Sequence, residues 1–219
     1  MAAVELIFPD LKPDQASLNE LEQDWPMFMK KLTSPNPGVL CGFHGWVLTE
    51  NGRNVRDENK KVVVFEWDKV ESFTSFITTS QFAEFAASIG HLFTGPPRPQ
   101  LFRTDTSPKD AASVGKMEIL RLTVQNSEAT ALALQIWEDI SVYLKTCYQE
   151  GVTVSYGKSQ NLADEIVVGL IGWHALENQS IETSGTGLEG FIEKLKSLGE
   201  LSCMGVGLED MKLPPVQGL

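Results

Sequence analysis

The chain has 219 residues, of which 42% are hydrophobic, so it can bury one substantial core or two small, tightly joined cores. Its formal net charge of −11 at pH 7 argues against nucleic acids and anionic membrane surfaces as partners, because like charges repel. The composition therefore disfavours disorder and polyanion binding, and it leaves an uncharged or cationic small ligand open.

Three features bear on the compartment. Residues 1–6 carry no basic region ahead of their apolar side chains, and no apolar run approaches the roughly 20 residues needed to span a bilayer. Cys41, Cys147 and Cys203 are odd in number and lie in apolar surroundings, which is typical of buried, reduced thiols. We therefore expect a soluble, cytoplasmic protein with no membrane partner.

The first elements are a strand over residues 4–8 and then a helix. Ser17 and Glu20 have the spacing of a capping box, and apolar residues follow at helical intervals. Pro26 falls inside the pattern, so we expect a kink or a restart there. The Pro- and Gly-containing turn at residues 34–38 ends this helix.

A hairpin comes next. Residues 39–49 and 61–67 both read as strands, and the turn between them contains Asn51-Gly52, a strong hairpin signal. A helix then starts near residue 69 and restarts after residue 79, with Ser80 as the expected N-cap. A strand over residues 100–104 completes this part of the chain.

After a polar linker the same order of elements recurs. Strand, helix, two strands joined by a polar turn, helix and strand are expected over residues 117–124, 128–148, 151–156, 166–173, 188–198 and 201–208. The long helix should bury one apolar stripe, formed by Leu132, Ile136, Ile140, Tyr143, Leu144 and Cys147.

The recurrence extends to single residues. Residues 61–77 and 165–177 each contain a β-rich apolar run that ends at a Trp and passes into an acidic turn, so Trp67 and Trp173 are equivalent. In both halves another Trp precedes a strand-opening Gly by about a dozen residues (Trp25 and Gly38, Trp137 and Gly151). The sequence therefore indicates an internal duplication.

Each half reads β-α-β-β-α-β, the ferredoxin-like unit. Two helices cover one face of such a sheet, so its other face must meet a second sheet, which the internal copy supplies. We predict an α+β protein in which two ferredoxin-like repeats form an intramolecular dimeric α/β barrel. The expected parts are a first half (1–105), a linker (106–115), a second half (116–212) and an irregular tail (213–219).

The segment Phe65-Glu-Trp-Asp-Lys-Val-Glu-Ser-Phe73, with its strand, Trp, acidic-Ser turn and helix, resembles the dimeric α+β barrel superfamily. The similarity is to its antibiotic-biosynthesis-monooxygenase-like branch, in a fused form familiar from fungal proteins. Members include cofactor-free oxygenases, polyketide cyclases, decarboxylases, isomerases and stress-responsive proteins. A His commonly found on the helix after the Trp motif is absent here, because residues 71–77 offer only Phe, Thr and Ser beside Glu71 and Ile77.

Candidate catalytic residues are polar groups within apolar strands. His44, flanked by glycines and aromatics, is the candidate general base, although it can equally be a core His bonded to backbone. Tyr156 and His174 are candidate donors to a developing enolate or phenolate; the alternatives are an ordinary half-buried strand Tyr and a His that faces solvent. Glu66 becomes a base if it points into a pocket, and is a solvated carboxylate if it points outward, the orientation that we favour.

Candidate substrate-binding residues are concentrated in the first half. His91 begins the loop 90–95, a possible pocket lid. The other candidates are aromatic: Trp46, Phe65, Trp67, Phe73, Phe76 and Phe85. We expect the first half to hold an aromatic-lined cavity and the second half to be mainly structural support.

Metal and nucleotide sites find little support. No two of the three His residues stand at i, i+2 or i, i+4, and no Cys-x-x-Cys occurs. Residues 185–190 match G-x-G-x-x-G, but the preceding strand ends about a dozen residues earlier, so we interpret them as a loop. We expect neither metal nor cofactor.

Together these features favour a cofactor-independent enzyme of secondary metabolism that acts on an aromatic polyketide or terpenoid-like substrate. Cyclisation, isomerisation, decarboxylation and monooxygenation all remain open. The alternative is a non-catalytic ligand-binding or stress-responsive barrel, since a fold supports many functions. The expected state is a monomer that forms a pseudo-dimer, or a homodimer.

Overall fold

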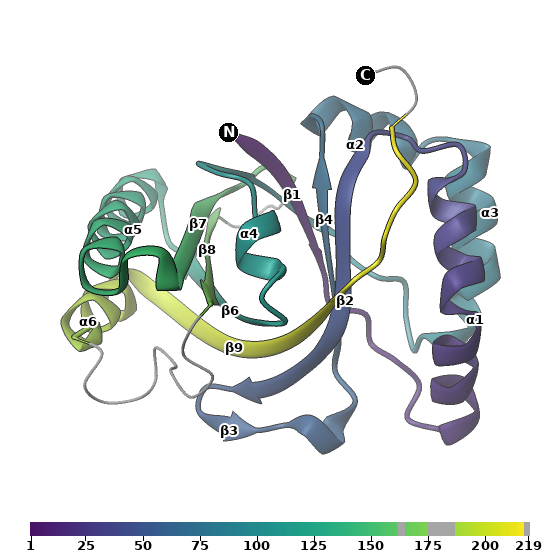
Figure 1. Cartoon of the computed structure of the whole chain (residues 1–219), viewed down its shortest axis with the longest axis horizontal. Helices are drawn as coiled ribbons and strands as arrows, with labels where there is room; N and C mark the ends of the chain where they lie inside the picture. Colours follow the sequence, from purple (N-terminus) through teal and green to yellow (C-terminus); the bar gives the residue numbers. More distant parts are fainter. Residues whose placement is uncertain (162–164, 175–186, 217–219) are drawn as a thin grey trace.

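Eight strands form a closed antiparallel barrel (Figure 1). The structure is a computed structural model that describes residues 1–161, 165–174 and 187–216. The strand order is β2-β4-β1-β5-β7-β8-β6-β9, and β9 pairs with β2 to close the barrel. The barrel strands are β1 (Ala2–Ile7), β2 (Val39–Glu50), β4 (Lys61–Trp67), β5 (Gln100–Thr104), β6 (Lys116–Val124), β7 (Val152–Ser159), β8 (Glu165–Trp173) and β9 (Gly199–Asp210).

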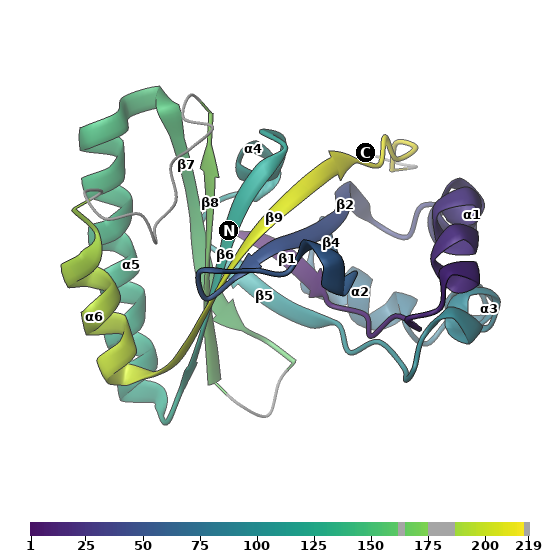
Figure 2. The same ribbon diagram turned by 90° about the horizontal axis from the view of Figure 1, so that it is seen from below.

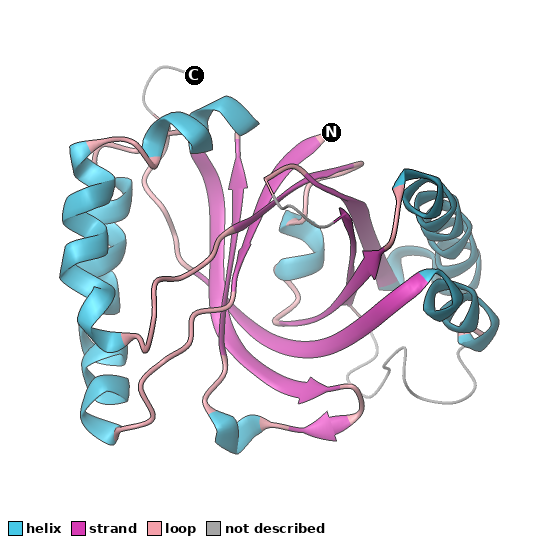
Figure 3. Cartoon of the chain, turned by 180° about the vertical axis from the view of Figure 1, so that it is seen from behind, coloured by secondary structure: helices cyan, strands magenta, loops and turns pink. Residues whose placement is uncertain are grey.

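The longer helices lie outside the barrel in two groups (Figures 2 and 3). They are α1 (Gln15–Thr33), α2 (Val70–Phe76) and α3 (Ser80–Ile89) on the first sheet, and α5 (Ser127–Tyr148) and α6 (Glu189–Leu198) on the second. Each half has the ferredoxin-like order of second, third, first and fourth strand, namely β2-β4-β1-β5 and β7-β8-β6-β9. The predicted α+β barrel of two repeats is confirmed.

The alternation of side chains along β4 separates two layers. Val62 and Val64 point into the barrel, where both sheets contribute to one core, whereas Val63, Phe65 and Trp67 point toward the helices. A period of two residues requires this division, because successive side chains leave opposite faces of a strand. The space between sheet and helices is thus separate from the barrel interior.

The Asn51-Gly52 turn leads into a two-residue strand rather than directly into β4. This strand, β3 (Arg53–Asn54), pairs with the end of β2, and a 3₁₀ helix (Arg56–Glu58) precedes β4. The predicted antiparallel pairing of β2 with β4 is confirmed.

Three helix details differ from expectation. Asp14, not Ser17, is the N-cap of α1, and its side chain accepts a hydrogen bond from the Ser17 N–H. Helix α1 continues through Pro26, which is exposed, so water can satisfy the carbonyl group that loses its intrahelical donor. Helix α3 is capped by the Thr79 side chain, which accepts a hydrogen bond from the Phe82 N–H, and Ser80 is its first residue.

The linker and the long helix also need correction. The segment 106–115 is more than a polar linker, because it forms α4 (Lys109–Ala112), whose Ala111 and Ala112 are buried in the barrel core. On α5 the buried face includes Ala133 and Trp137, while Leu132 is 51% exposed. The other short helices are Gly90–Leu92 and Gln149–Gly151.

The burial of the cysteines differs from the prediction. None of the three forms a disulfide, but Cys147 is exposed instead of buried, because it lies on the outer side of α5. Cys41 and Cys203 are half-buried.

Candidate functional site

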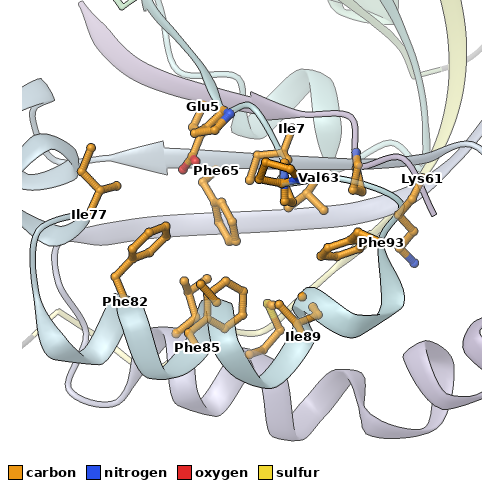
Figure 4. A pocket seen from close by; sticks show the side chains of 18 of the residues that line it. Glu5, Ile7, Lys61, Val63, Phe65, Ile77, Phe82, Phe85, Ile89 and Phe93 are labelled. Carbon is orange, nitrogen blue, oxygen red and sulfur yellow. The ribbon is translucent and has the colours of Figure 1, made fainter. Parts of the chain in front are cut away.

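A cavity of about 440 Å³ lies between the outer face of the first sheet and α1, α2 and α3 (Figure 4). Strands β1 and β4 form its floor, and segment 93–99, after the short helix Gly90–Leu92, closes one side. Its wall is largely apolar and contains the aromatic rings of Trp25, Phe65, Trp67, Phe73, Phe76, Phe82, Phe85 and Phe93.

The aromatic rings support one another. Trp67 meets Phe73 edge to face at 5.6 Å between ring centroids and Phe76 at 5.7 Å, and Phe76 meets Phe82 edge to face at 5.5 Å. These separations lie in the favourable range for aromatic pairs. The wall is therefore suited to a flat, hydrophobic ring system.

One carboxyl group lies in this wall. Glu5 is 5% exposed, and its Oε2 accepts a hydrogen bond of 2.8 Å from Trp67 Nε1. Its other oxygen has no hydrogen-bond partner among the described residues, and the side chain points toward the cavity (Figure 4). Burial raises the pKa of Glu5 to about 7, although the Trp67 hydrogen bond opposes this rise. The carboxyl can therefore gain or lose a proton near neutral pH.

Lys61 occupies the other end of the cavity, where it meets a neighbouring open groove lined also by His44 and Trp46. Its Nζ lies 3.1 Å from His44 Nδ1, 5.0 Å from the ring centre of Trp25 and 4.5 Å from that of Trp46. Burial lowers the pKa of Lys61 to about 8. Burial, followed by the charge of Lys61, lowers the pKa of His44 to about 4, so the imidazole is neutral at pH 7.

No family model matches this sequence, and no curated protein matches it. Among solved structures, an anthrone oxidase-like protein superimposes with a TM-score of 0.64 at 10% identity, over 100% of this chain and 97% of the other. A candidate monooxygenase from Fusobacterium nucleatum gives 0.60 at 14% identity, over 100% and 96%. A candidate monooxygenase from Lactobacillus acidophilus gives 0.56 at 10% identity, over 98% and 96%.

The chain has the dimeric α+β barrel fold. Here a single polypeptide supplies both halves of the barrel, so the sequences of the two halves can diverge. The second half repeats the buried carboxyl, because Trp173 Nε1 donates to Glu118 Oε2 at 2.9 Å. There, however, Trp137 is fully buried and its ring packs on Gly169, where an added Cβ would lie 2.0 Å from the ring. Trp137 thus fills the space that is open in the first half.

The barrel places five predicted substrate-binding residues around one cavity: Phe65, Trp67, Phe73, Phe76 and Phe85. His44 and Trp46 line the adjacent groove instead. His91 is exposed and bonds Glu20 at 2.6 Å, so it does not line the cavity, although its loop does.

The other predicted catalytic residues lie elsewhere. Glu66 is neither solvated nor in the cavity, because strand alternation turns it away, and it accepts hydrogen bonds from Cys41 and Ser107. Tyr156 stacks on Trp137 in the second half, at 6.4 Å between centroids.

His174 lies at the end of β8, exposed, with Thr153 Oγ1 2.5 Å from its Nε2. The Gly-rich stretch 185–190 falls partly outside the described residues, which resume at 187. Within the described residues, no group of three metal-ligating side chains is found, and no helix is long and apolar enough to cross a membrane.

Glu5 and Lys61 are not part of any sequence motif. A signal for Glu5 does exist, because a Glu stands between apolar residues in the first strand of both repeats, at Glu5 and at Glu118. Their partners confirm the equivalence, since Glu5 pairs in register with Phe65 and Glu118 with Ile171, each two residues before the Trp.

Proposed function

We propose that this protein is a cofactor-independent enzyme that transfers a proton to or from a hydrophobic aromatic substrate, with Glu5 as the general base. The observation that carries the proposal is a buried carboxyl in the wall of an aromatic-lined cavity, with one oxygen that has no hydrogen bond to the residues the structure describes. A carboxyl whose pKa is raised to about 7 fits this role, because proton transfer is most efficient when the pKa is near the working pH.

Each neighbour of Glu5 has a definite part in this chemistry. The Trp67 N–H holds one carboxylate oxygen, and the other oxygen faces the substrate. Aromatic rings around it exclude water and orient a flat substrate in a volume of about 440 Å³, within the usual range of about 300–1,000 Å³ for small-molecule sites. Removal of a C–H or O–H proton then leaves an anion delocalised over the ring system.

Oxidation is the outcome we favour among those open from the sequence, since structures of the same fold are named as an anthrone oxidase-like protein and candidate monooxygenases. An anthrone that loses a methylene proton to Glu5 gives a carbanion that O₂ can oxidise directly. The resulting hydroperoxide loses water, so that one anthrone and one O₂ give one anthraquinone and one water. The equation balances without a further reductant.

The test is anthrone oxidation followed by oxygen uptake and quinone absorbance. The protein should accelerate the reaction, and Glu5→Gln should lower the rate about a hundredfold or more, the usual contribution of a positioned base. Glu118→Gln is the matched control, because it alters the equivalent carboxyl in the half where the Trp137 ring packs on Gly169. Equal rates for Glu5→Gln and wild type would overturn the assignment of the base.

A non-catalytic ligand-binding barrel is the second candidate. One observation favours it: the Glu–Trp hydrogen bond occurs in both halves, including the half in which Trp137 fills the space, so the pair can serve the fold alone. This function predicts that an aromatic ligand binds wild type and Glu5→Gln equally, and that wild type accelerates no proton transfer. Deuterium exchange at the anthrone methylene, measured without oxygen, separates the two candidates.

A further inference from the structure

Lys61 is a buried cation that has no carboxylate partner in the described part of the chain. Lys61 is only 5% exposed, and among the described residues no carboxylate lies within ion-pair distance of its Nζ. The adjacent Lys60 shows the contrast, since its Nζ lies 2.6 Å from Glu50 and 3.1 Å from Glu58. Two neighbouring lysines thus differ in both burial and pairing.

Burying an ammonium group is costly unless an opposite charge and hydrogen bonds compensate. Around Lys61 the compensation comes from the Trp25 and Trp46 rings and from one imidazole nitrogen of His44, all of them neutral. Glu22 and Glu209 line the groove beyond, and their charge raises the pKa of Lys61, but burial outweighs them. An anion at this point would complete the pairing.

The position of Lys61 relative to Glu5 sets the shape of the ligand. Glu5 pairs in register with Phe65, and Lys61 lies four residues earlier on the same strand. At a strand rise of about 3.3 Å per residue, the two register positions are about 13 Å apart. The lining between them is apolar and aromatic (Figure 4).

We propose that Lys61 binds a carboxylate carried by the aromatic substrate, at the junction of cavity and groove, while the ring system extends toward Glu5. This inference rests on the proposed function for the identity of the site, and it adds the substrate class: an aromatic acid. His44 is a positioning residue, because its Nδ1 accepts a hydrogen bond from the ammonium and holds it beside the two Trp rings.

Paired probes test the proposal. The dissociation constants of anthraquinone-2-carboxylate and of its neutral isostere anthraquinone-2-carboxamide are measured by calorimetry at neutral pH. Wild type should prefer the carboxylate about tenfold, the expected size of one charge-assisted hydrogen bond. Lys61→Met should lose the preference while still binding the carboxamide.

Lys60→Met is the matched control, since it removes the same charge from the next residue, outside the cavity, and should keep the preference. A preference that survives in Lys61→Met, or that Lys60→Met also loses, overturns the proposal. If Lys61→Met does not fold, the pH dependence of the wild-type preference tests the proposal instead. The preference must fall as the ammonium loses its proton above about pH 8, with His44, Glu22 and Glu209 as the other titratable groups facing it. A preference that stays constant up to about pH 10 contradicts it.

Failure here is distinguishable from failure of the proposed function. Equal affinity of wild type for both probes, with the Glu5 effect on oxidation intact, overturns the carboxylate site alone. A carboxylate preference without any acceleration of anthrone oxidation or exchange supports the site and overturns the base.

Discussion

The Glu5 carboxyl group couples the proposed chemistry to stability. Its ordinary pKa of 4.5 rises in the folded protein to about 7, because burial disfavours the charged form. Between these values the folded chain holds a proton that the unfolded chain releases. The contribution of Glu5 to stability therefore falls as the pH rises from about 4.5 to about 7 and levels off above that, in contrast to that of a salt-bridged carboxylate.

Glu5→Gln should remove this dependence, since Gln is neutral at every pH and its carbonyl oxygen can still accept the Trp67 N–H. The free energy of unfolding of the variant relative to wild type should rise by about 3 kcal/mol between about pH 4 and pH 8. Urea denaturation across this range measures it. The contributions of all other titrating groups cancel in this difference. A difference in unfolding free energy that does not change with pH would show that the pKa of Glu5 is not raised.

His44 and Glu5 show the limits of reading single residues from the sequence. His44 stands out because imidazole is rare in an apolar strand, but only the fold shows that Lys61 occupies its Nδ1. Glu5 is inconspicuous because a Glu in a first strand is usually solvated, and α2 and α3, far along the chain, bury it. The aromatic cavity residues were predictable as a group, since their density marks the half with the larger apolar space.

Among the elements, the strands at the seams between the halves approach each other closely at glycines. On the β2–β9 seam an added Cβ at Gly45 would lie 1.7 Å from the Gly207 carbonyl oxygen. On the β5–β7 seam an added Cβ at Gly157 would lie 2.0 Å from the Arg103 carbonyl oxygen. Both obstacles are backbone atoms, which cannot rotate away, so each seam requires a glycine at this position.

Gly45→Ala should therefore destabilise the protein by about 2 to 3 kcal/mol, as overpacking of a close contact does. Gly190→Ala is the control, because no described atom lies within 4 Å of its added Cβ and a helical Ala should add about 0.5 to 1 kcal/mol. Thermal or urea unfolding compares the two. If both variants unfolded like wild type, the β2–β9 seam would have to be looser than it is here.

Most elements followed from local patterns, because alternation and helical periodicity are written directly in the side chains. The exceptions arose where tertiary contacts override local preference. The helix α4 formed in a polar segment because Ala111 and Ala112 fit the end of the barrel core, and α1 tolerated Pro26 on its exposed side. Neither the packing of α4 nor the exposure of Pro26 can be predicted from the pattern of neighbouring residues in the sequence.

For the whole molecule, fusion of the two repeats permits a division of labour. One chain encodes both sheets, so a substitution in one half is not copied to the other. Trp25 borders the open cavity and is half-buried, whereas its counterpart Trp137 is fully buried over Gly169. The duplication could be predicted from the sequence. Which half keeps an open cavity depends on the orientation of the Trp25 or Trp137 indole ring.

Trp137→Ala should open a second cavity in the position that corresponds to the first. Loss of a buried Trp side chain should destabilise the protein by about 3 to 5 kcal/mol. Among the residues that the structure describes, the Trp137 Nε1 atom has no hydrogen-bond partner, so the expected loss is one of packing. Trp25→Ala is the matched control and should cost less, because its ring already lies beside open space.

Indole added to the Trp137→Ala protein should occupy the new cavity, since large apolar cavities stay dry and bind apolar ligands of matching size. It should raise the melting temperature of this variant more than that of wild type, because binding to the folded state alone stabilises it. The test uses the difference between the two rises in melting temperature, because the first-half cavity can bind indole in both proteins. An equal rise in both would mean that the second half collapses around the missing ring. The open space of the first half would then be a property of its own helices, not of the indole position.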